Sequence, residues 1–237
     1  MPCVSEIIYS RDATVQAFRD YFKFLMAMYL DESVVVEPPE DGWDTINPIG
    51  WANFDKTDKV IDLLRHLPYI NMDINIAPDC EFVDWHTIPV EMDGTDIKEA
   101  TEPDPEDATI PFHIVGLTLQ NTRGLTFLLD TELGVIYWRE CMSEAKNEIL
   151  EVEWRAGSGI WEITGFFEML KANFKSLNFV PFRPDKFKAA WYGRSAEAQE
   201  TLEGVQKIYK DHGWPDLMRY RKDDCLAAIE AYLKTRD

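Results

Sequence analysis

Long apolar runs are missing from this sequence of 237 residues. No stretch approaches the roughly 20 apolar residues that a membrane-spanning helix needs. The first residues include Glu6 and have neither the basic flank nor the apolar core of a secretory signal peptide. From these absences we expect no association with membranes and a location in the cytosol or the nucleus.

Cysteine motifs are missing as well. The four cysteines are Cys3, Cys80, Cys141 and Cys225, and they form neither a CxxC pair nor a framework of short spacings. Widely scattered cysteines in a chain without a signal peptide are typical of reduced thiols. We therefore expect these side chains to be structural rather than cross-linked.

Motifs for metal, phosphate or nucleophile chemistry are also absent. The sequence has four histidines, His66, His86, His113 and His212. No two of them have the HxxxH or HExxH spacing of a zinc site. The glycine-rich segment 157–159 lacks the lysine of a P-loop and the spacing of a nucleophile elbow. The sequence therefore predicts no metal, no cofactor and no catalytic residue.

What the sequence has in excess is acid. It contains 43 Asp and Glu against 24 Lys and Arg, a net charge of −19. Residues 1–179 hold 33 acids and 13 bases, whereas residues 180–237 hold 10 acids and 11 bases. A negative field repels phosphate backbones, so we expect no nucleic-acid binding. The same field attracts a protein partner with a basic surface; the alternative is that the charge serves solubility alone.

The most informative segment runs from Pro111 to Phe182. Three apolar segments, His113–Leu119, Leu125–Leu129 and Val135–Arg139, are separated by turns at Asn121–Gly124 and Asp130–Gly134. Asn and Gly at these turns supply the positive φ angles of tight hairpins, which predicts an antiparallel meander. The middle segment is apolar on both faces, which is typical of a central strand.

An amphipathic helix is predicted at Ile163–Leu177, with Thr164 as its cap. Its apolar positions recur at helical spacing: Ile163, Phe166, Phe167, Leu170, Phe174 and Leu177. Strands followed by a returning helix indicate an α+β fold with a mixed or mostly antiparallel sheet backed by helices.

Further elements complete this expectation. Helices are predicted at Thr14–Tyr29, from Thr57, after Ser195 and after Asp223, and strands at Tyr69–Ala77 and Cys80–Ile88. We expect residues 1–180 to form the α+β domain. Residues 181–237, read as a polar connector and two helices, are expected to form a C-terminal extension packed on the same domain.

The segment Glu91–Asp107 contains eight acidic residues, one lysine and two prolines. Such a composition buries too little surface to offset its ordering entropy, so a mobile, solvated loop is predicted. We select four of its acids as candidate partner-binding residues: Glu99, Glu102, Asp104 and Glu106. The alternative is a solvated loop that binds nothing.

The sequences LTFLLDTELGVIYW and FFEMLKANFKSLNF, in the meander and the helix, resemble the SUKH superfamily. The segments PPEDGW, LLRHLPYI and DHGWPDL are similar to fungal proteins of that kind. The superfamily includes a yeast regulator of cell-wall synthesis and bacterial immunity proteins that neutralise toxins. The resemblance implies an α+β domain that acts by binding, without catalytic residues to carry over.

Two functions from different classes therefore stay open. One is a non-enzymatic protein-interaction module, and the other is an enzyme or small-ligand-binding protein with an unrecognised acidic site. A shallow acidic groove would favour the first, and a deep pocket with convergent polar groups would favour the second.

Overall fold

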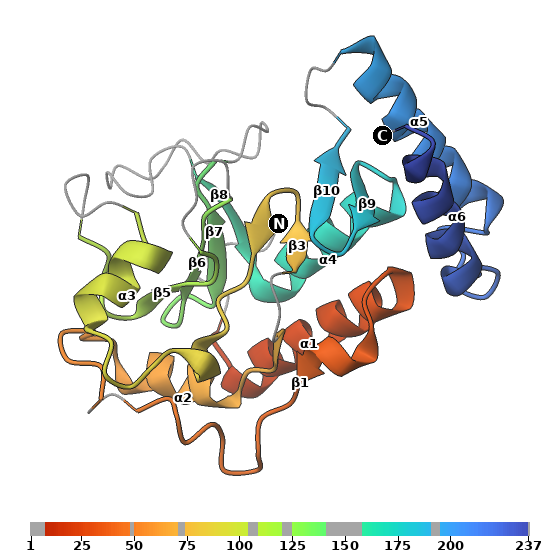
Figure 1. Cartoon of the computed structure of the whole chain (residues 1–237). Helices are drawn as coiled ribbons and strands as arrows, with labels where there is room; N and C mark the ends of the chain where they lie inside the picture. The colour runs from red at the N-terminus through yellow and green to blue at the C-terminus, as the bar shows by residue number, and fades with distance from the viewer. Residues whose placement is uncertain are drawn as a thin grey trace.

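The computed structural model describes residues 8–47, 50–70, 74–103, 109–119, 125–140, 158–190 and 195–236. It has an α+β fold, as predicted (Figure 1). The helices are α1 (Arg11–Met28), η2 (Glu32–Val34), α2 (Asp58–His66), η3 (Trp85–Thr87), α3 (Gly94–Thr101), α4 (Ile163–Lys175), α5 (Ala196–Asp211) and α6 (Lys222–Lys234). The strands are β1 (Val35–Val36), β2 (Tyr69–Ile70), β3 (Asn75–Ala77), β4 (Cys80–Glu81), β5 (Ile114–Gly116), β6 (Phe127–Asp130), β7 (Val135–Trp138), β8 (Gly159–Glu162), β9 (Phe179–Arg183) and β10 (Lys186–Ala189).

The largest sheet is an antiparallel meander in the order β5-β6-β7-β8. Strand β6 lies between β5 and β7, which confirms the central position predicted for it. Its turn to β7 is held by Asp130, whose Oδ1 accepts from the backbone of Glu132 at 2.8 Å and of Leu133 at 2.9 Å. Gly134 completes the turn with φ 68°. The predicted turn at Asn121–Gly124 lies outside the described residues.

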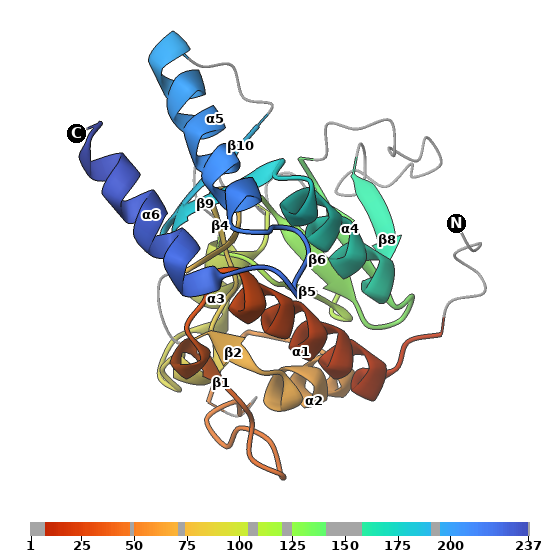
Figure 2. The same ribbon diagram turned by 90° about the vertical axis from the view of Figure 1, so that its right-hand side faces the viewer.

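Helix α4 packs its aromatic stripe against this sheet, as predicted (Figure 2). The ring of Phe166 lies 4.8 Å from that of Phe127 on β6. Helix α1 packs on α4 in turn, with Phe18 and Phe167 centroids 4.8 Å apart. The predicted cap is wrong, because the N-cap position is Glu162 and no side chain caps it.

The N-terminal helix begins three residues earlier than predicted. Its cap is Ser10, whose Oγ accepts from the backbone N of Ala13 at 3.3 Å. Thr14 lies inside the helix, where its hydroxyl donates to the carbonyl of Ser10 at 2.8 Å. By contrast, α2 begins where it was predicted, next to Thr57, which caps the helix by accepting from the backbone N of Val60 at 3.4 Å.

The two strands predicted before residue 90 are shorter in the structure. The segment Tyr69–Ala77 is divided between β2, which pairs with β1, and β3, which pairs with β4. In the segment Cys80–Ile88, β4 is followed by an isolated antiparallel bridge between Phe82 and Thr118, and the chain then turns through η3. The hydroxyl of Thr87 donates to the carbonyl of Asp84 at 3.0 Å, a local bond that competes with strand pairing.

Strands β9 and β10 pair as an antiparallel β-hairpin over residues 179–189, although a polar connector was predicted from residue 181 on. Phe187 and Ala189 face the interior and alternate with Lys186 and Lys188, and this short period-2 pattern was missed. The hairpin leads through residues 191–194 to α5, which Ser195 caps as expected.

The C-terminal helices pack on the same core as α1 and α4. Trp214 donates its indole N–H to the carbonyl of Phe174 at 3.0 Å, and Tyr220 donates to that of Met28 at 2.8 Å. The amine of Lys222 donates to the carbonyl of Met26 at 2.8 Å. In the described part of the chain, no helix combines the length and hydrophobicity needed to cross a bilayer.

Candidate docking groove

The acidic segment expected to be a mobile loop contains a helix instead. Asp93 caps α3, accepting from the backbone N of Thr95 at 2.8 Å. Ile97 and Thr101, four residues apart, are each 1% exposed. One capped turn and one buried face were enough to order a segment whose overall composition favours a loop.

The four candidate partner-binding residues differ in their exposure to solvent and in whether the structure describes them. Glu99 is exposed on α3. Glu102 is 5% exposed and follows the end of that helix. Asp104 and Glu106 lie outside the described residues. The structure therefore leaves Glu99 on the surface and corrects the expectation that Glu102 is solvated.

Glu102 forms an ion pair with Lys56, with Oε1 and Nζ 2.6 Å apart and side chains 5% and 1% exposed. Burial raises the pKa of Glu102 above its usual range, against the opposing effect of Lys56. Burial likewise lowers the pKa of Lys56. In this buried position each charge stabilises the other, because removal of either side chain would leave the other as an unpaired buried charge.

The ion pair secures α3 against the edge of β5. A hydrogen bond from the backbone of Gly116 on β5 also favours the ionised carboxylate of Glu102. A Cβ at Gly116 would lie 1.9 Å from the carbonyl oxygen of Thr101, so only glycine allows this approach. Glu102 is therefore part of the scaffold beneath the surface.

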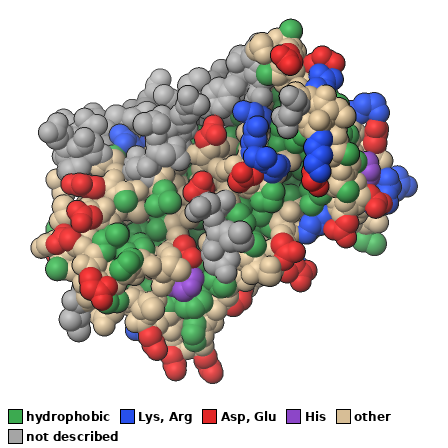
Figure 3. All heavy atoms as spheres, in the orientation of Figure 1, with side chains coloured by type: hydrophobic (Ala, Val, Ile, Leu, Met, Phe, Trp, Pro, Cys, Tyr) green, Lys and Arg blue, Asp and Glu red, His purple; other side chains and the backbone are tan. Residues whose placement is uncertain are grey.

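A groove of about 350 Å³ lies beside α3, between that helix and the β4–η3 segment. Most of its lining is apolar: Ile70, Phe82, Val83, Ile88, Met92, Ile97, Ala100 and Leu119. Met92 and Leu119 are 39% and 41% exposed, so the groove presents apolar side chains to solvent. Figure 3 shows apolar side chains gathered over the α3 end of the molecule, with Asp and Glu side chains around them.

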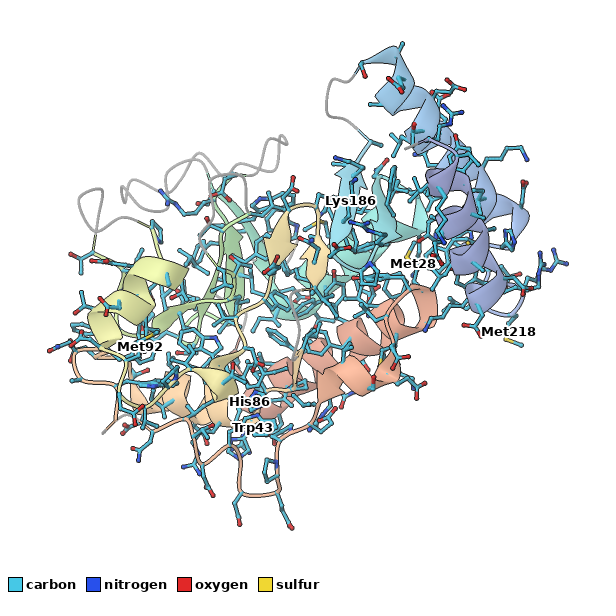
Figure 4. The ribbon with its side chains drawn as sticks, in the orientation of Figure 1. Met28, Trp43, His86, Met92, Lys186 and Met218 are labelled. Atoms are coloured by element: carbon cyan, nitrogen blue, oxygen red, sulfur yellow. The ribbon has the colours of Figure 1, made fainter. Side chains whose placement is uncertain are left out.

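Two carboxylates, Glu81 and Asp84, belong to the lining of the groove. Asp84 contacts Nδ1 of His86, and burial raises the pKa of Asp84 above its usual range. The imidazole of His86 lies beside the ring of Trp43, with centroids 4.3 Å apart (Figure 4). It also lies 5.7 Å from the ring of Tyr69, and the Trp43 and Tyr69 rings are 6.1 Å apart, so the three rings form one cluster. These contacts hold His86 in place, and His86 in turn fixes Asp84 at the groove wall.

Sequence reasoning missed Glu81, Asp84 and Met92 as site residues. The first two were placed in a strand, and Met92 was counted only as part of an acidic loop. The residues come from segments whose proximity depends on tertiary folding. The one local signal was Asp93 followed by Asp96 and Ile97, which is a capped helix start beside Met92.

A second polar cluster, around Asp130, is a weaker candidate for a functional site. His113 lies 3.8 Å from Asp130 (Nε2 to Oδ2), and Tyr137 donates to the same oxygen at 3.3 Å. Asp130 is fully buried and its other oxygen holds the β6–β7 turn, which gives this cluster a structural role. Within the described ranges, no three His, Cys, Asp or Glu side chains gather in a way that could hold a metal ion.

No family model, curated protein or solved structure matches this chain. The groove is therefore interpreted from its own geometry and charge.

Proposed function

We propose that this chain is a protein-interaction module whose groove binds an apolar side chain flanked by lysine or arginine residues of a partner. The observation that carries this proposal is the combination of an apolar floor with Glu81 and Asp84 in the same groove. Burial of an apolar anchor supplies affinity, and the carboxylates select basic neighbours for it. The resemblance of the meander and the aromatic helix to the SUKH superfamily also implies a domain that acts by binding.

The character of the lining supports a peptide-like occupant. Met92 is flexible and polarizable, a property that suits surfaces which adapt to different side chains. Asp96 lies one turn before Ala100 on α3, so its exposed carboxylate extends the acidic border of the groove. The acid excess of residues 1–179 adds a long-range field that attracts a basic partner.

The alternative, an enzyme or small-ligand-binding protein, has less support from the groove. Such sites place a few free polar groups where they converge on the ligand. Among the described residues that line this groove, two carry hydroxyl groups, and both hydroxyls already donate to backbone carbonyls. Thr87 donates to the carbonyl of Asp84 at 3.0 Å, and Thr101 donates to that of Ile97 at 2.9 Å.

Selection from a displayed library of random peptides tests the proposal. The groove variant is Ala100→Arg, which places a cation in the groove at an exposed helical position. The matched control is Ala231→Arg, the same change at an exposed position of α6. We expect selected peptides to combine Leu, Met, Ile or Phe with adjacent Lys or Arg.

Fluorescence anisotropy then measures the affinity of a consensus peptide for each protein. We expect Ala100→Arg to weaken binding by at least about tenfold, since about 1.4 kcal/mol of lost interaction suffices. Ala231→Arg should bind as the parent does. Peptides without basic residues, or equal affinity for both variants, would show that this groove is not the docking site.

A further inference from the structure

The turn between α5 and α6 presents apolar side chains to solvent. Met218 is 95% exposed, the highest value among the large apolar residues that the structure describes, and Leu217 is 50% exposed. The side chains of Arg219 and Arg221 are 83% and 56% exposed. We call Leu217, Met218, Arg219 and Arg221 the tip.

The tip is held in a fixed conformation. Asp216 Oδ1 accepts from the backbone N of Met218 at 3.0 Å, and the carbonyl of Asp216 accepts from those of Arg219 and Tyr220 at 2.9 and 2.8 Å. Trp214, 3% exposed, anchors the turn on one side. A preorganised apolar segment loses little conformational entropy when it binds.

The tip therefore has the chemistry that the proposed function assigns to the partner. We propose that a second copy of this chain is such a partner, and that its tip docks into the groove of the first. Met218 and Leu217 would fill the apolar floor, and Arg219 and Arg221 would face Glu81 and Asp84. This inference rests on the proposed function of the groove.

The ion pairs that Arg219 and Arg221 form within their own chain do not prevent docking to a second copy. Arg219 lies 3.6 Å from Asp216, and Arg221 lies 3.4 Å from Asp224. All four side chains are more than half exposed, and exposed pairs of this kind contribute little to stability. Arg221 also donates from Nη2 to the carbonyl of Asp211 at 3.5 Å, which is a long and weak hydrogen bond. Both arginines can therefore exchange these local contacts for carboxylates of another copy. Lys222 does not take part, because its amine is bonded to the carbonyls of Met26 and Leu30.

The space is adequate for the occupant. An apolar cavity of about 150 Å³ holds a molecule of benzene. The groove of about 350 Å³ therefore accommodates a methionine together with a leucine side chain.

The tip and the groove lie at opposite ends of the molecule, as Met218 and Met92 show in Figure 4. A chain therefore does not fill its own groove. Each copy that docks leaves one tip and one groove free, which gives head-to-tail assemblies unless the rotation closes a ring. A single tip buries less than the roughly 1,000 Å² of a stable interface, so we expect weak association that depends on concentration.

Sedimentation velocity of the full-length chain, from the micromolar to the millimolar range, tests this inference. We expect the weight-average mass to rise toward twice the monomer mass or beyond. Met218→Asp removes the tip anchor, and Ala100→Arg blocks the groove. Each variant alone should stay monomeric with an unchanged melting temperature, because both positions are exposed. Met218→Ser and Ala100→Gln serve if either first variant fails to fold.

An equimolar mixture of the two variants provides the decisive measurement. The intact groove of Met218→Asp and the intact tip of Ala100→Arg should form a heterodimer that cannot grow further. A mixture that stays monomeric while the parent assembles would overturn the inference, as would assembly of Met218→Asp alone. If the parent is monomeric throughout while its groove still selects basic apolar peptides, self-assembly is wrong and the proposed function stands. If the parent stays monomeric and the peptide selection also yields no basic apolar peptides, both self-assembly and the proposed function are wrong.

Discussion

Two carboxylates three residues apart show how differently one acidic segment can be used. Glu99 lies in the exposed face of α3, whereas Glu102, just beyond its end, is 5% exposed and paired with Lys56 at 2.6 Å. Their sequence surroundings are equally acidic. The local density of acidic residues therefore could not predict that Glu99 is exposed and that Glu102 is buried.

The difference arises from the residues that the fold brings next to each carboxylate. Lys56 precedes Glu102 by 46 positions, and Gly116 contributes from a strand that follows it. Both come close only because α3 lies against β5. Among the described residues, none forms an ion pair with Glu99 on the exposed face of α3, and its carboxylate faces the solvent.

The largest expected effect comes from breaking the buried pair. We expect Glu102→Gln to lower the free energy of unfolding by about 3–5 kcal/mol, because it leaves Lys56 buried without a counter-charge. Glu99→Gln should change this free energy by less than about 0.5 kcal/mol, as exposed substitutions usually do. Denaturant titration of both variants measures the contrast. Similar losses in the two would mean that the Lys56–Glu102 pair is not a structural element.

A smaller effect is expected in the pH dependence of Glu102→Gln. Burial already lowers the pKa of Lys56 below the usual range of a lysine, and removal of Glu102 takes away the main influence that opposes this shift. A lysine with a lowered folded pKa stabilises the protein above its unfolded pKa and loses that contribution as pH falls through its folded pKa. The variant should therefore gain stability relative to the parent as pH rises toward about 10.4, the pKa of an unperturbed lysine.

The double variant Lys56→Met/Glu102→Leu is the control for this measurement. It has neither charge, so the gain with pH should disappear. Because an apolar pair of similar size can replace a buried ion pair, we expect its stability within about 1 kcal/mol of the parent or above it. A double variant as unstable as Glu102→Gln would assign the loss to packing rather than to the unpaired lysine.

The sequence predicted the parts of the fold that depend on neighbours in the chain. Asp130 and Gly134 define the β6–β7 turn within five residues, and the Phe166 stripe defines α4 within four turns. Strand β8 was missed, because its assignment depends on pairing with β7 across residues 139–158. Glycines beside it made the segment resemble a loop.

The groove could be predicted less well than the fold. Its acids and its apolar floor come from β4, the segment before α3, α3 itself and residue Leu119. None of these segments shows from its own pattern that it faces the others. The sequence did show that acidic residues are concentrated in Glu91–Asp107, because that observation needs only their number.

The smallest structural effect, and the sharpest functional one, is expected from neutralising the exposed acids of α3. Asp96→Asn with Glu99→Gln should slow association with a basic apolar peptide while the melting temperature stays nearly unchanged, since both positions are exposed. The matched control is Glu197→Gln with Glu203→Gln, two exposed acids of α5, which lies far from α3 in Figure 1. Stopped-flow rates across a salt series decide the matter, because salt screens such attraction over about 8–10 Å. The parent should lose its rate advantage over the α3 variant as salt rises, and the α5 variant should follow the parent. An on-rate that responds neither to salt nor to the α3 substitutions would mean that this acidity serves solubility rather than recognition.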